Sequence, residues 1–447
     1  MPESKKAQVR RNAWRGRRAR KPRKRTAVWS RSDSSEPSQR GEERGSLVGV
    51  CSLVLGAAVG VGVLALPERV EQSGFAASTV VDLLPMFGLL LCNAISIVEV
   101  NAEMLQQDLQ SGKPMRTVTL TEMARRAFGP LAADATSVVY FLLGGALIIS
   151  YVDKAGSTLS AFLPWLHLSP GFTGSCFAVS LATLIAFGGV NAADSINRVG
   201  TISLLASYVV LVSACALSSD PSLLLQPPRS WAEPISSLPT AFLCLSFHDT
   251  LPPIFAEYAK GDVALMRRAI IISATAAVLL FVVWDAAALS QFSQGFRIEL
   301  LEQSSNPLVS LGSELFALAA LSTSFCTGYL GLSEATRSTV IKSYARVSGG
   351  NEPSRGVQNA TIAIVLLSVP LIVDEVFPGL FMRLSSQAGG YGQALLWGVG
   401  APAVSLRMEK TDGSVRTISN SKPLAVFLLL ISGGVIVSQA LTDLNVL

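Results

Sequence analysis

Two stretches combine helix-breaking residues with long apolar runs, and each could hold a polar ligand inside a membrane. The first, LVLGAAVGVGVLALP, contains Gly56, Gly60 and Gly62 ahead of Pro67. Glycine disfavours a continuous helix, and unwound backbone is tolerated in lipid only where it is buried or lines a cavity. An interrupted helix exposes N–H groups at one end and carbonyl oxygens at the other. These ends suit the carboxylate and the ammonium group of an amino-acid zwitterion.

The second stretch, LPTAFLCLSFHDTLPPIFAEY, places Ser246, His248 and Asp249 just ahead of Pro252 and Pro253. Tandem prolines remove two backbone donors and predict a break in the helix. Taken alone, each stretch is also explained by close packing through glycines or by a simple proline kink. Their corresponding places in the two halves of the chain favour a pair of broken helices. The middle of each stretch lacks lysine and arginine, as expected where backbone dipoles bind the ligand.

Ionisable side chains at membrane depth are costly and therefore indicate function. Glu99 is the deepest carboxylate in the apolar map. His248 is the only histidine at a predicted break, and imidazole titrates near neutral pH. Asp153, Lys154 and Asp285 are expected near an interface, as solvated or snorkelling charges. Glu99 and His248 are thus the candidates for proton coupling.

A hydroxyl cluster, Ser322, Thr323 and Ser324, could ligate a cation or simply hydrogen-bond carbonyls of its own helix. The six cysteines form no CxxC pair and only two histidines exist, so we expect free buried thiols and no metal site. The absence of GxSxG, HExxH and GxxxxGK[ST] motifs argues against a membrane enzyme and an ATP-driven pump. We therefore expect neither catalytic residues nor a cofactor.

The elements that must position these residues are apolar helices. The 447-residue chain is 50% hydrophobic and only 15% charged, with a mean hydropathy of +0.45, whereas soluble domains are about 25% charged. Segments of about 20 apolar residues span the roughly 30 Å hydrocarbon core. Eleven such segments are predicted: 47–67, 80–104, 134–155, 172–190, 199–217, 237–256, 268–289, 308–332, 359–377, 388–406 and 423–441. The fold class is an all-α, multi-pass membrane protein whose partner is the lipid bilayer, with a transmembrane domain over 47–442.

Charge is unevenly distributed along the chain. Residues 1–46 carry 15 basic and 5 acidic side chains. This tail is either a transit peptide or a polybasic segment that rests on anionic lipid, and nucleic-acid binding would lack a folded module. With the N-terminus on the cytoplasm-like side, 16 basic residues of the connecting loops fall on that side and 5 on the other. The positive-inside rule is obeyed, and the C-terminus is expected opposite.

Eleven helices divide into two blocks of five and one extra helix. Because five is odd, the second block would be inverted relative to the first, as in many secondary transporters. The expected repeats are about 47–217 and about 237–406, followed by an extra helix at about 423–441. The two interrupted stretches then form helices 1 and 6, which are the first helices of their repeats.

Several motifs resemble the hydroxy/aromatic amino acid permeases, the tyrosine- and tryptophan-specific transporters of bacteria and plastids in the amino acid/polyamine/organocation superfamily. In family order, the similar segments are GAAVGVGVLALP, EVN at 99–101, DSINRV at 194–199, SFHDTLPPI, the run 269–284, TSFCTGYLGLSE at 323–334, FPGLF at 377–381 and AGGYGQALLWGVGAP. Each motif alone is weak, but their common order over about residues 47–406 makes the resemblance fairly specific.

The resemblance implies proton-coupled import of tyrosine, tryptophan or a related amino acid, in a plastid-type organelle inner membrane or a plasma membrane. With the residue patterns above, the expected substrate-binding residues are Gly56, Ala57, Ala58, Gly60, Gly62, Ser246, Phe247 and His248. The expected ion-coupling residues are Glu99, His248, Thr323 and Ser324.

The chain departs from the family at Ala57 and Ala58, where hydroxyl residues are usual, and at Asp249, so the exact substrate stays open. The alternatives are a non-transporting amino-acid receptor on the same fold and a sodium-coupled symporter of another small amino acid.

Overall fold

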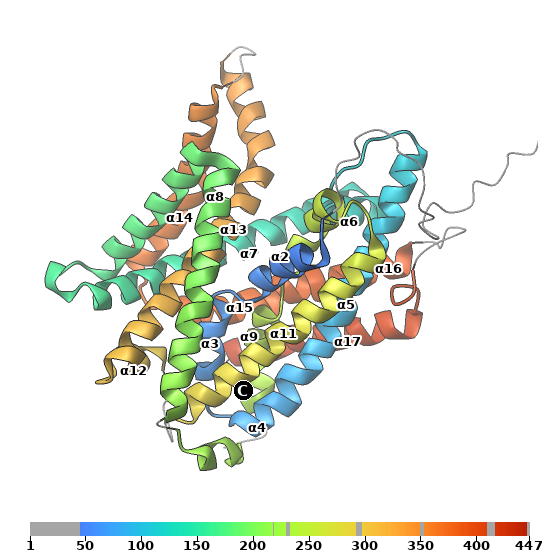
Figure 1. The fold of residues 1–447 in the computed structure, drawn as a ribbon. Coiled ribbons are helices and arrows are strands. Elements are labelled where there is room, and N and C mark those ends of the chain that lie inside the picture. The colour runs from blue at the N-terminus through green and yellow to red at the C-terminus, as the bar shows by residue number, and fades with distance from the viewer. Residues whose placement is uncertain are drawn as a thin grey trace, which may run out of the picture. The chain divides into compact units, whose positions relative to one another are not determined.

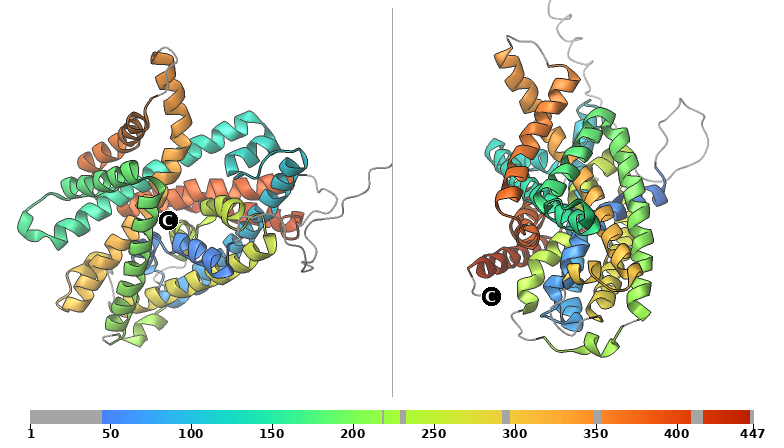
Figure 2. Two further views of the ribbon diagram at one scale, coloured as in Figure 1. Left: turned by 45° about the horizontal axis from the view of Figure 1, so that its top comes forward. Right: turned by 90° about the vertical axis from the view of Figure 1, so that its left-hand side faces the viewer.

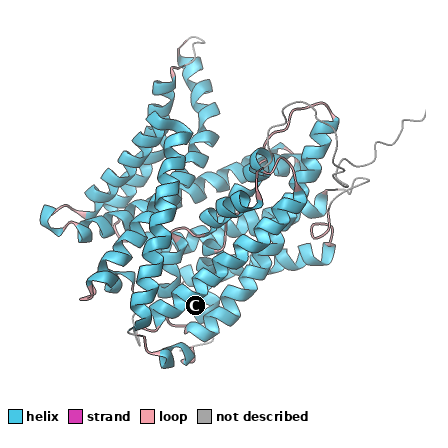
Figure 3. Ribbon diagram, viewed as in Figure 1, coloured by secondary structure: helices cyan, strands magenta, loops and turns pink. Residues whose placement is uncertain are grey.

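The structure is a computed structural model that describes residues 45–217, 219–228, 233–291, 297–348, 353–408 and 416–444. These residues belong to one compact unit, Glu43–Lys410 with Val415–Leu447. Throughout the described ranges the regular elements are helices, without a strand (Figure 3). Nearly all of the basic tail, residues 1–44, lies outside the described residues.

Long apolar helices make up most of the unit (Figure 1). They are α5 (Leu84–Gln110), α7 (Pro130–Phe162), α8 (Pro170–Leu217), α11 (Val263–Leu289), α13 (Pro307–Val347), α14 (Arg355–Val376) and α17 (Lys422–Asp443). α8 contains two apolar stretches, Pro170–Gly188 and Ser195–Leu217. By length and composition, eight helices of the described chain can cross a membrane, or nine with the bent pair α2 (Leu47–Ala58) and α3 (Gly62–Val70).

The other two predicted spans are helical but divided. The span at 237–256 consists of α9 (Glu233–Cys244), η4 (His248–Thr250), α10 (Leu251–Pro253) and η5 (Ile254–Tyr258). The span at 388–406 consists of α15 (Phe381–Gln387), the π-helix η6 (Ala388–Gly400) and α16 (Ala401–Arg407). η1 (Thr79–Leu83) and the short α4 (Phe75–Ser78) extend α5 at its start, and α12 (Ile298–Glu302) precedes α13.

Three boundaries differ from the sequence prediction. α8 continues through the loop predicted between residues 190 and 199, and its two halves run in different directions in Figure 1. α13 does not end at residue 332 but continues to Val347. Its total length is 41 residues, or about 60 Å at 1.5 Å per residue, so the helix is longer than the roughly 30 Å hydrocarbon core of a membrane. A short helix, α6 (Leu120–Phe128), fills a predicted loop. Its N-cap Thr119 accepts the N–H of Glu122, a capping-box spacing that the sequence already contained.

The loops predicted for the cytoplasm-like side contact one another at one end of the helices. The Gly45 N–H donates to the Tyr258 carbonyl over 3.0 Å, and the Thr117 hydroxyl donates to the Glu257 carboxylate over 2.8 Å. These contacts join the start of α2, the loop before α6 and the end of η5. The predicted grouping of these loops on one side is therefore compatible with the structure.

The loops predicted for the opposite side also meet. Lys154 Nζ lies 2.7 Å from Glu299 Oε1 and 3.4 Å from Glu302 Oε1, and the Asp153 carboxylate accepts backbone N–H groups of residues 379–381. Lys154 was expected to be solvated, but only 2% of its side chain is exposed. The prediction was wrong for Lys154 because α12 supplies two carboxylates that neutralise the buried charge.

The long helices form a scaffold around the two interrupted segments. α13 lies against α7 and α8, and α11 lies against α2 and α5. α17 contacts η6 and α9, and Figure 2 shows α13 and α14 side by side in both views. Helices 1 and 6 are therefore enclosed by helices from both halves of the sequence.

Candidate functional site

Helix 1 is interrupted as the glycine spacing predicted. α2 and α3 meet at 52°, separated by residues 59–61. The Val59 N–H closes the last turn of α2 on the Leu55 carbonyl over 2.9 Å. The Val61 N–H leaves this ladder and donates to Ser324 Oγ of α13 over 3.0 Å. α13 thus stabilises the break by accepting one of the backbone donors that the break exposes.

Helix 6 is interrupted at the corresponding place. α9 ends at Cys244, and the Ser246 N–H makes a tighter turn onto the Leu243 carbonyl over 3.1 Å. The chain then continues through η4 and α10, whose Pro252 and Pro253 cannot donate to the preceding turn. The predicted break before the tandem prolines is confirmed.

The two breaks touch each other. Cys244 Sγ donates to the Gly62 carbonyl over 3.0 Å. A Cβ added to Gly62 would lie 2.9 Å from the Cys244 Cα, so only glycine allows this approach of the two backbones. From α11, Trp284 Nε1 donates to the Val63 carbonyl over 2.8 Å. The start of α3 is therefore held from two sides.

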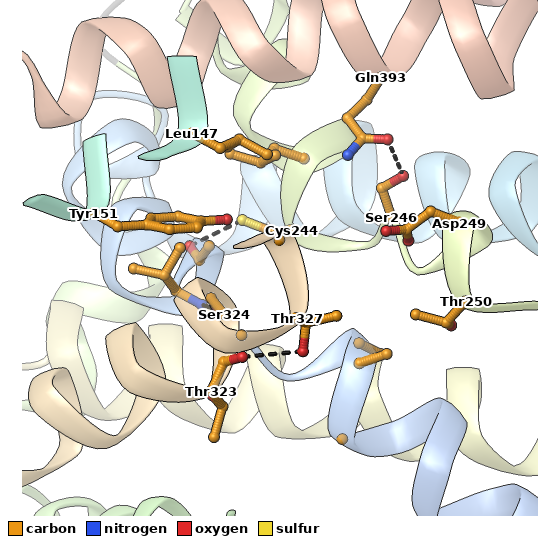
Figure 4. Close-up of a pocket in the computed structure, with 18 residues that line it drawn as sticks. Leu147, Tyr151, Cys244, Ser246, Asp249, Thr250, Thr323, Ser324, Thr327 and Gln393 are labelled. Carbon is orange, nitrogen blue, oxygen red and sulfur yellow. Dashed lines mark hydrogen bonds between the residues drawn. The ribbon is translucent and has the colours of Figure 1, made fainter. Parts of the chain in front are cut away.

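A cavity of about 110 Å³ lies between the breaks (Figure 4). Its lining includes most of the residues that the sequence analysis proposed: Gly56, Ala57, Ala58, Gly60, Gly62, Ser246, Thr323 and Ser324. The lining residues that were not proposed are Val61, Leu147, Tyr151, Leu243, Cys244, Asp249, Thr250, Thr327, Gly328 and Gln393. The cavity thus combines unwound backbone, hydroxyl groups and one carboxylate with a small apolar surface.

Phe247 and His248 are not brought into this cavity. Phe247 is 3% exposed and lines a separate apolar pocket between α2, α5 and α11. His248 is fully buried, with Nε2 3.0 Å from the Leu90 carbonyl and its ring stacked between Phe247 and Trp397. The turn after Ser246 directs these two rings towards α5. They pack on the side of the break that faces away from the cavity.

Glu99 lies away from the cavity, in the middle of α5. Its buried carboxylate accepts the N–H groups of Thr417 and Ser419, each over 2.9 Å, and both of their hydroxyls. The guanidinium of Arg267 is its ion-pair partner. These contacts hold the segment before α17 against α5 and α11. In this structure the Glu99 carboxylate therefore stabilises the packing of these three segments.

Two of the three clustered hydroxyls of α13 hydrogen-bond within their own helix, and the third contacts helix 1. Ser322 donates to the Leu318 carbonyl over 2.7 Å and Thr323 donates to the Ala320 carbonyl over 3.0 Å, within their own helix. Ser324 instead reaches helix 1, as described above. Thr323 and Ser324 both line the cavity, and their part in ion coupling stays a prediction.

Asp285 was expected near an interface, but its residue is 2% exposed and its Oδ1 finds no partner within the described chain. It directly follows Trp284 in α11, and both residues are buried. Pattern analysis placed it late in an apolar run and could not tell which face of the helix it occupies.

Metal binding finds no support in the described part of the chain, where no group of three or more His, Cys, Asp and Glu side chains is close enough to hold an ion. The six cysteines are free. Three are buried as predicted, Cys215, Cys244 and Cys326, whereas Cys176 is exposed.

Among the residues that sequence analysis missed, Gln393 of η6 and Tyr151 of α7 had no pattern to mark them. The Gln393 Oε1 accepts the Ser246 hydroxyl over 2.8 Å. Asp249 was visible only as a departure from the family pattern. In Figure 4, Ser246, Asp249 and Gln393 lie together on one side of the cavity, with Tyr151 and Leu147 on the other.

Comparison with known proteins adds a family likeness. The sequence profile of the tryptophan/tyrosine permease family matches residues 43–439. "Tyrosine-specific transport system 1" of Haemophilus influenzae is 26% identical over 361 residues, which are 76% of this chain and 83% of that protein. "Tryptophan-specific transport protein" of Pseudomonas aeruginosa is 25% identical over 260 residues, 57% of this chain and 60% of that protein.

A solved structure shares the fold. The crystal structure of MhsT in complex with L-phenylalanine superimposes with a TM-score of 0.57 at 16% identity, covering 91% of this chain and all of that one. The predicted fold class, an all-α inverted-repeat transporter fold with broken helices 1 and 6, is confirmed.

Proposed function

Because this chain belongs to the tryptophan/tyrosine permease family, we propose that it is a secondary active transporter of aromatic amino acids such as tyrosine and tryptophan. The observation that carries the proposal is the cavity of about 110 Å³ between two broken helices that contact each other. Such breaks near the middle of a membrane are where transporters of this architecture bind their substrates.

The backbone of the two breaks supplies partners for both charges of the substrate. α3 begins at Gly62 inside the cavity lining, and its N-terminal N–H groups attract a carboxylate. α2 and α9 end at Ala58 and Cys244, beside the cavity, and their C-terminal carbonyls attract an ammonium group. An amino-acid zwitterion bound between these ends needs no lysine or arginine.

Binding requires the cavity to enlarge. A cavity of about 150 Å³ is known to hold benzene, and an aromatic amino acid is larger than benzene. The present volume of about 110 Å³ is therefore too small for the whole substrate. Outward movement of the helices around the breaks, as in alternating access, would supply the space.

We propose the proton as the coupling ion, with His248 as the main candidate group. Its imidazole faces the Leu90 carbonyl at 3.0 Å, so a change of protonation would alter the contact of helix 6 with α5. Glu99 stays the second candidate, although its contacts are those of a structural ion pair. Thr323 and Ser324, at the cavity wall, are the corresponding candidates for sodium.

Uptake of labelled tyrosine into proteoliposomes tests this proposal. An inward proton gradient should drive accumulation, and an inward sodium gradient at equal pH should not. His248→Gln should reduce proton-driven accumulation more than it reduces tyrosine binding, and Glu99→Gln provides the comparison. Sodium-driven accumulation that is lost in Ser324→Ala would contradict proton coupling and support the sodium alternative. Tight binding without any uptake would favour the receptor alternative.

A further inference from the structure

Asp249 places a carboxylate in the cavity that the backbone of the breaks does not require. Its side chain is exposed to the cavity although the residues around it, including His248, are buried. Across the described residues, no lysine, arginine or histidine forms an ion pair with it. A carboxyl group that faces the cavity without an ion-pair partner offers its oxygens as acceptors to a donor on the ligand.

Asp249 lies apart from the backbone groups proposed to bind the carboxylate and the ammonium group of the substrate. Figure 4 shows it across the cavity from Tyr151, whereas Cys244, which contacts Gly62 at the start of α3, lies between them. A substrate carboxylate has no donor for the Asp249 oxygens and is attracted instead by the N–H groups at the α3 N-terminus. The ammonium group is served by the carbonyl ends of α2 and α9. What remains to contact Asp249 is the substrate's side chain.

Gln393 complements Asp249 on the same side of the cavity. Its Oε1 accepts the Ser246 hydroxyl over 2.8 Å, so its amide nitrogen is left as a donor. Figure 4 shows this nitrogen turned towards the cavity. Together the two side chains present one acceptor and one donor. A phenol hydroxyl both donates and accepts, and an indole N–H donates, whereas a phenyl ring does neither.

We propose that Asp249 and Gln393 form a subsite that recognises a hydrogen-bond donor on the aromatic ring of the substrate. The inference deepens the proposed function and rests on it. The Asp249 carboxylate accepts the phenol O–H or the indole N–H, and the Gln393 amide donates to the phenol oxygen. Tyrosine and tryptophan are then preferred over phenylalanine.

The size of the preference for tyrosine over phenylalanine depends on the cost of leaving Asp249 and Gln393 without a hydrogen-bond partner when phenylalanine binds. A site built to hydrogen-bond a substrate hydroxyl can reject the analogue that lacks it by about 10⁴-fold or more. Asp249 is accessible from the cavity, so water can replace part of the lost contact. We therefore expect a preference of at least about tenfold.

Equilibrium binding to the purified full-length protein in lipid nanodiscs tests the subsite. The ligands are tyrosine, tryptophan, phenylalanine and O-methyltyrosine, which keeps the ring and its oxygen and replaces the donor hydrogen with a methyl group. The unmodified protein should bind phenylalanine and O-methyltyrosine at least about tenfold more weakly than tyrosine. Asp249→Ala should bring the four affinities close together by weakening tyrosine and tryptophan selectively.

Glu257→Gln is the matched control. It removes a carboxylate from the same segment of helix 6, where Glu257 accepts the Thr117 hydroxyl outside the cavity lining. It should leave the preference for tyrosine over phenylalanine unchanged. If Asp249→Ala does not fold, the comparison of tyrosine with both the smaller phenylalanine and the larger O-methyltyrosine on the unmodified protein still decides the question.

Three results would speak against the inference, and they differ in what else they affect. Equal binding of tyrosine, phenylalanine and O-methyltyrosine by the unmodified protein overturns the subsite and leaves aromatic amino acid transport in place. An equal loss for all ligands in Asp249→Ala assigns the carboxylate to the ammonium group and also overturns it. Binding of none of the four ligands defeats the proposed function itself, and the inference falls with it.

Discussion

At the scale of single residues, the site depends on how closely side chains approach the two breaks. Ser324 Oγ accepts the Val61 N–H over 3.0 Å, and a Cβ on Gly60 would lie 2.7 Å from the same oxygen. Gly60 therefore leaves room for the contact that joins helix 1 to α13. Phe247, in contrast, supports the break from behind and lines no part of the cavity.

Gly60→Val should abolish tyrosine binding while the protein still inserts and folds. The new side chain displaces the Ser324 hydroxyl from the Val61 N–H and enters the cavity. Binding and detergent melting are measured on the same sample. Gly433→Ala in α17 is the folding control, because a Cβ there meets nothing within 4 Å. A folded Gly60→Val protein with unchanged affinity would remove helix 1 from the site.

Phe247→Ala should destabilise the protein without changing its preference among ligands. Truncation of a buried phenylalanine costs about 3–5 kcal/mol in folding free energy, and Phe247 is 3% exposed in a pocket separate from the cavity. The expected result is a lower melting temperature with an unchanged ratio of tyrosine to tryptophan affinity. A changed ratio at unchanged stability would show that the aromatic ring reaches the substrate, as the sequence analysis proposed.

At the scale of helices, the short α3 is held in place by its neighbours. It has nine residues, and isolated helices of that length are marginal in water. α11 contributes Trp284 and helix 6 contributes Cys244, and each donates to a carbonyl in the first turn of α3. α13 contributes Ser324 to the residue just before it. Three elements distant in sequence thus define the angle of the break.

Trp284→Phe isolates one of these supports. The substitution keeps an aromatic ring in the core but removes the N–H that donates to the Val63 carbonyl, leaving a buried acceptor without its partner. Such a loss costs about 1–3 kcal/mol, so the melting temperature should fall and tyrosine binding should weaken. Trp165→Phe is the control, because Trp165 is 66% exposed. Equal melting temperatures for both variants would contradict the role of α11 in holding α3.

At the scale of the whole molecule, the charge pattern and the contacts between loops group the same segments. The segments around Gly45, Thr117, Tyr258 and Glu257 meet at one end, and those around Lys154 and Glu299 meet at the other. This division matches the 16 to 5 distribution of basic residues between the two sets of loops. Eleven membrane crossings with the termini on opposite sides stay a prediction.

Single cysteines in a cysteine-free version test this topology. Ser343→Cys lies on the exposed, extended end of α13, and Leu444→Cys lies just after α17, where Leu444 is 71% exposed. A membrane-impermeant maleimide should label the two positions from opposite faces of sealed vesicles. Labelling of both from the same face would mean that the number of crossings between them is even, contrary to the map.

The sequence by itself determined the helical class, the approximate membrane spans and the places of both breaks. Hydropathy, the positive-inside asymmetry, glycine spacing and tandem prolines act through nearby residues, so a linear pattern contains them. The glycines and hydroxyls proposed for the site therefore line the cavity: Gly56, Gly60, Gly62, Ser246, Thr323 and Ser324.

Only the tertiary structure decided which side chains around a break face inwards. Once helix 6 leaves the regular 3.6-residue period, rotation about its backbone places Asp249 in the cavity and His248 behind it, and no periodic pattern predicts that outcome. Gln393 joins the site from another helix more than a hundred residues later. The partners that bury Glu99 and Lys154 are also more than a hundred residues away in sequence. Contacts of this kind depend on how whole helices pack, which local residue patterns do not encode.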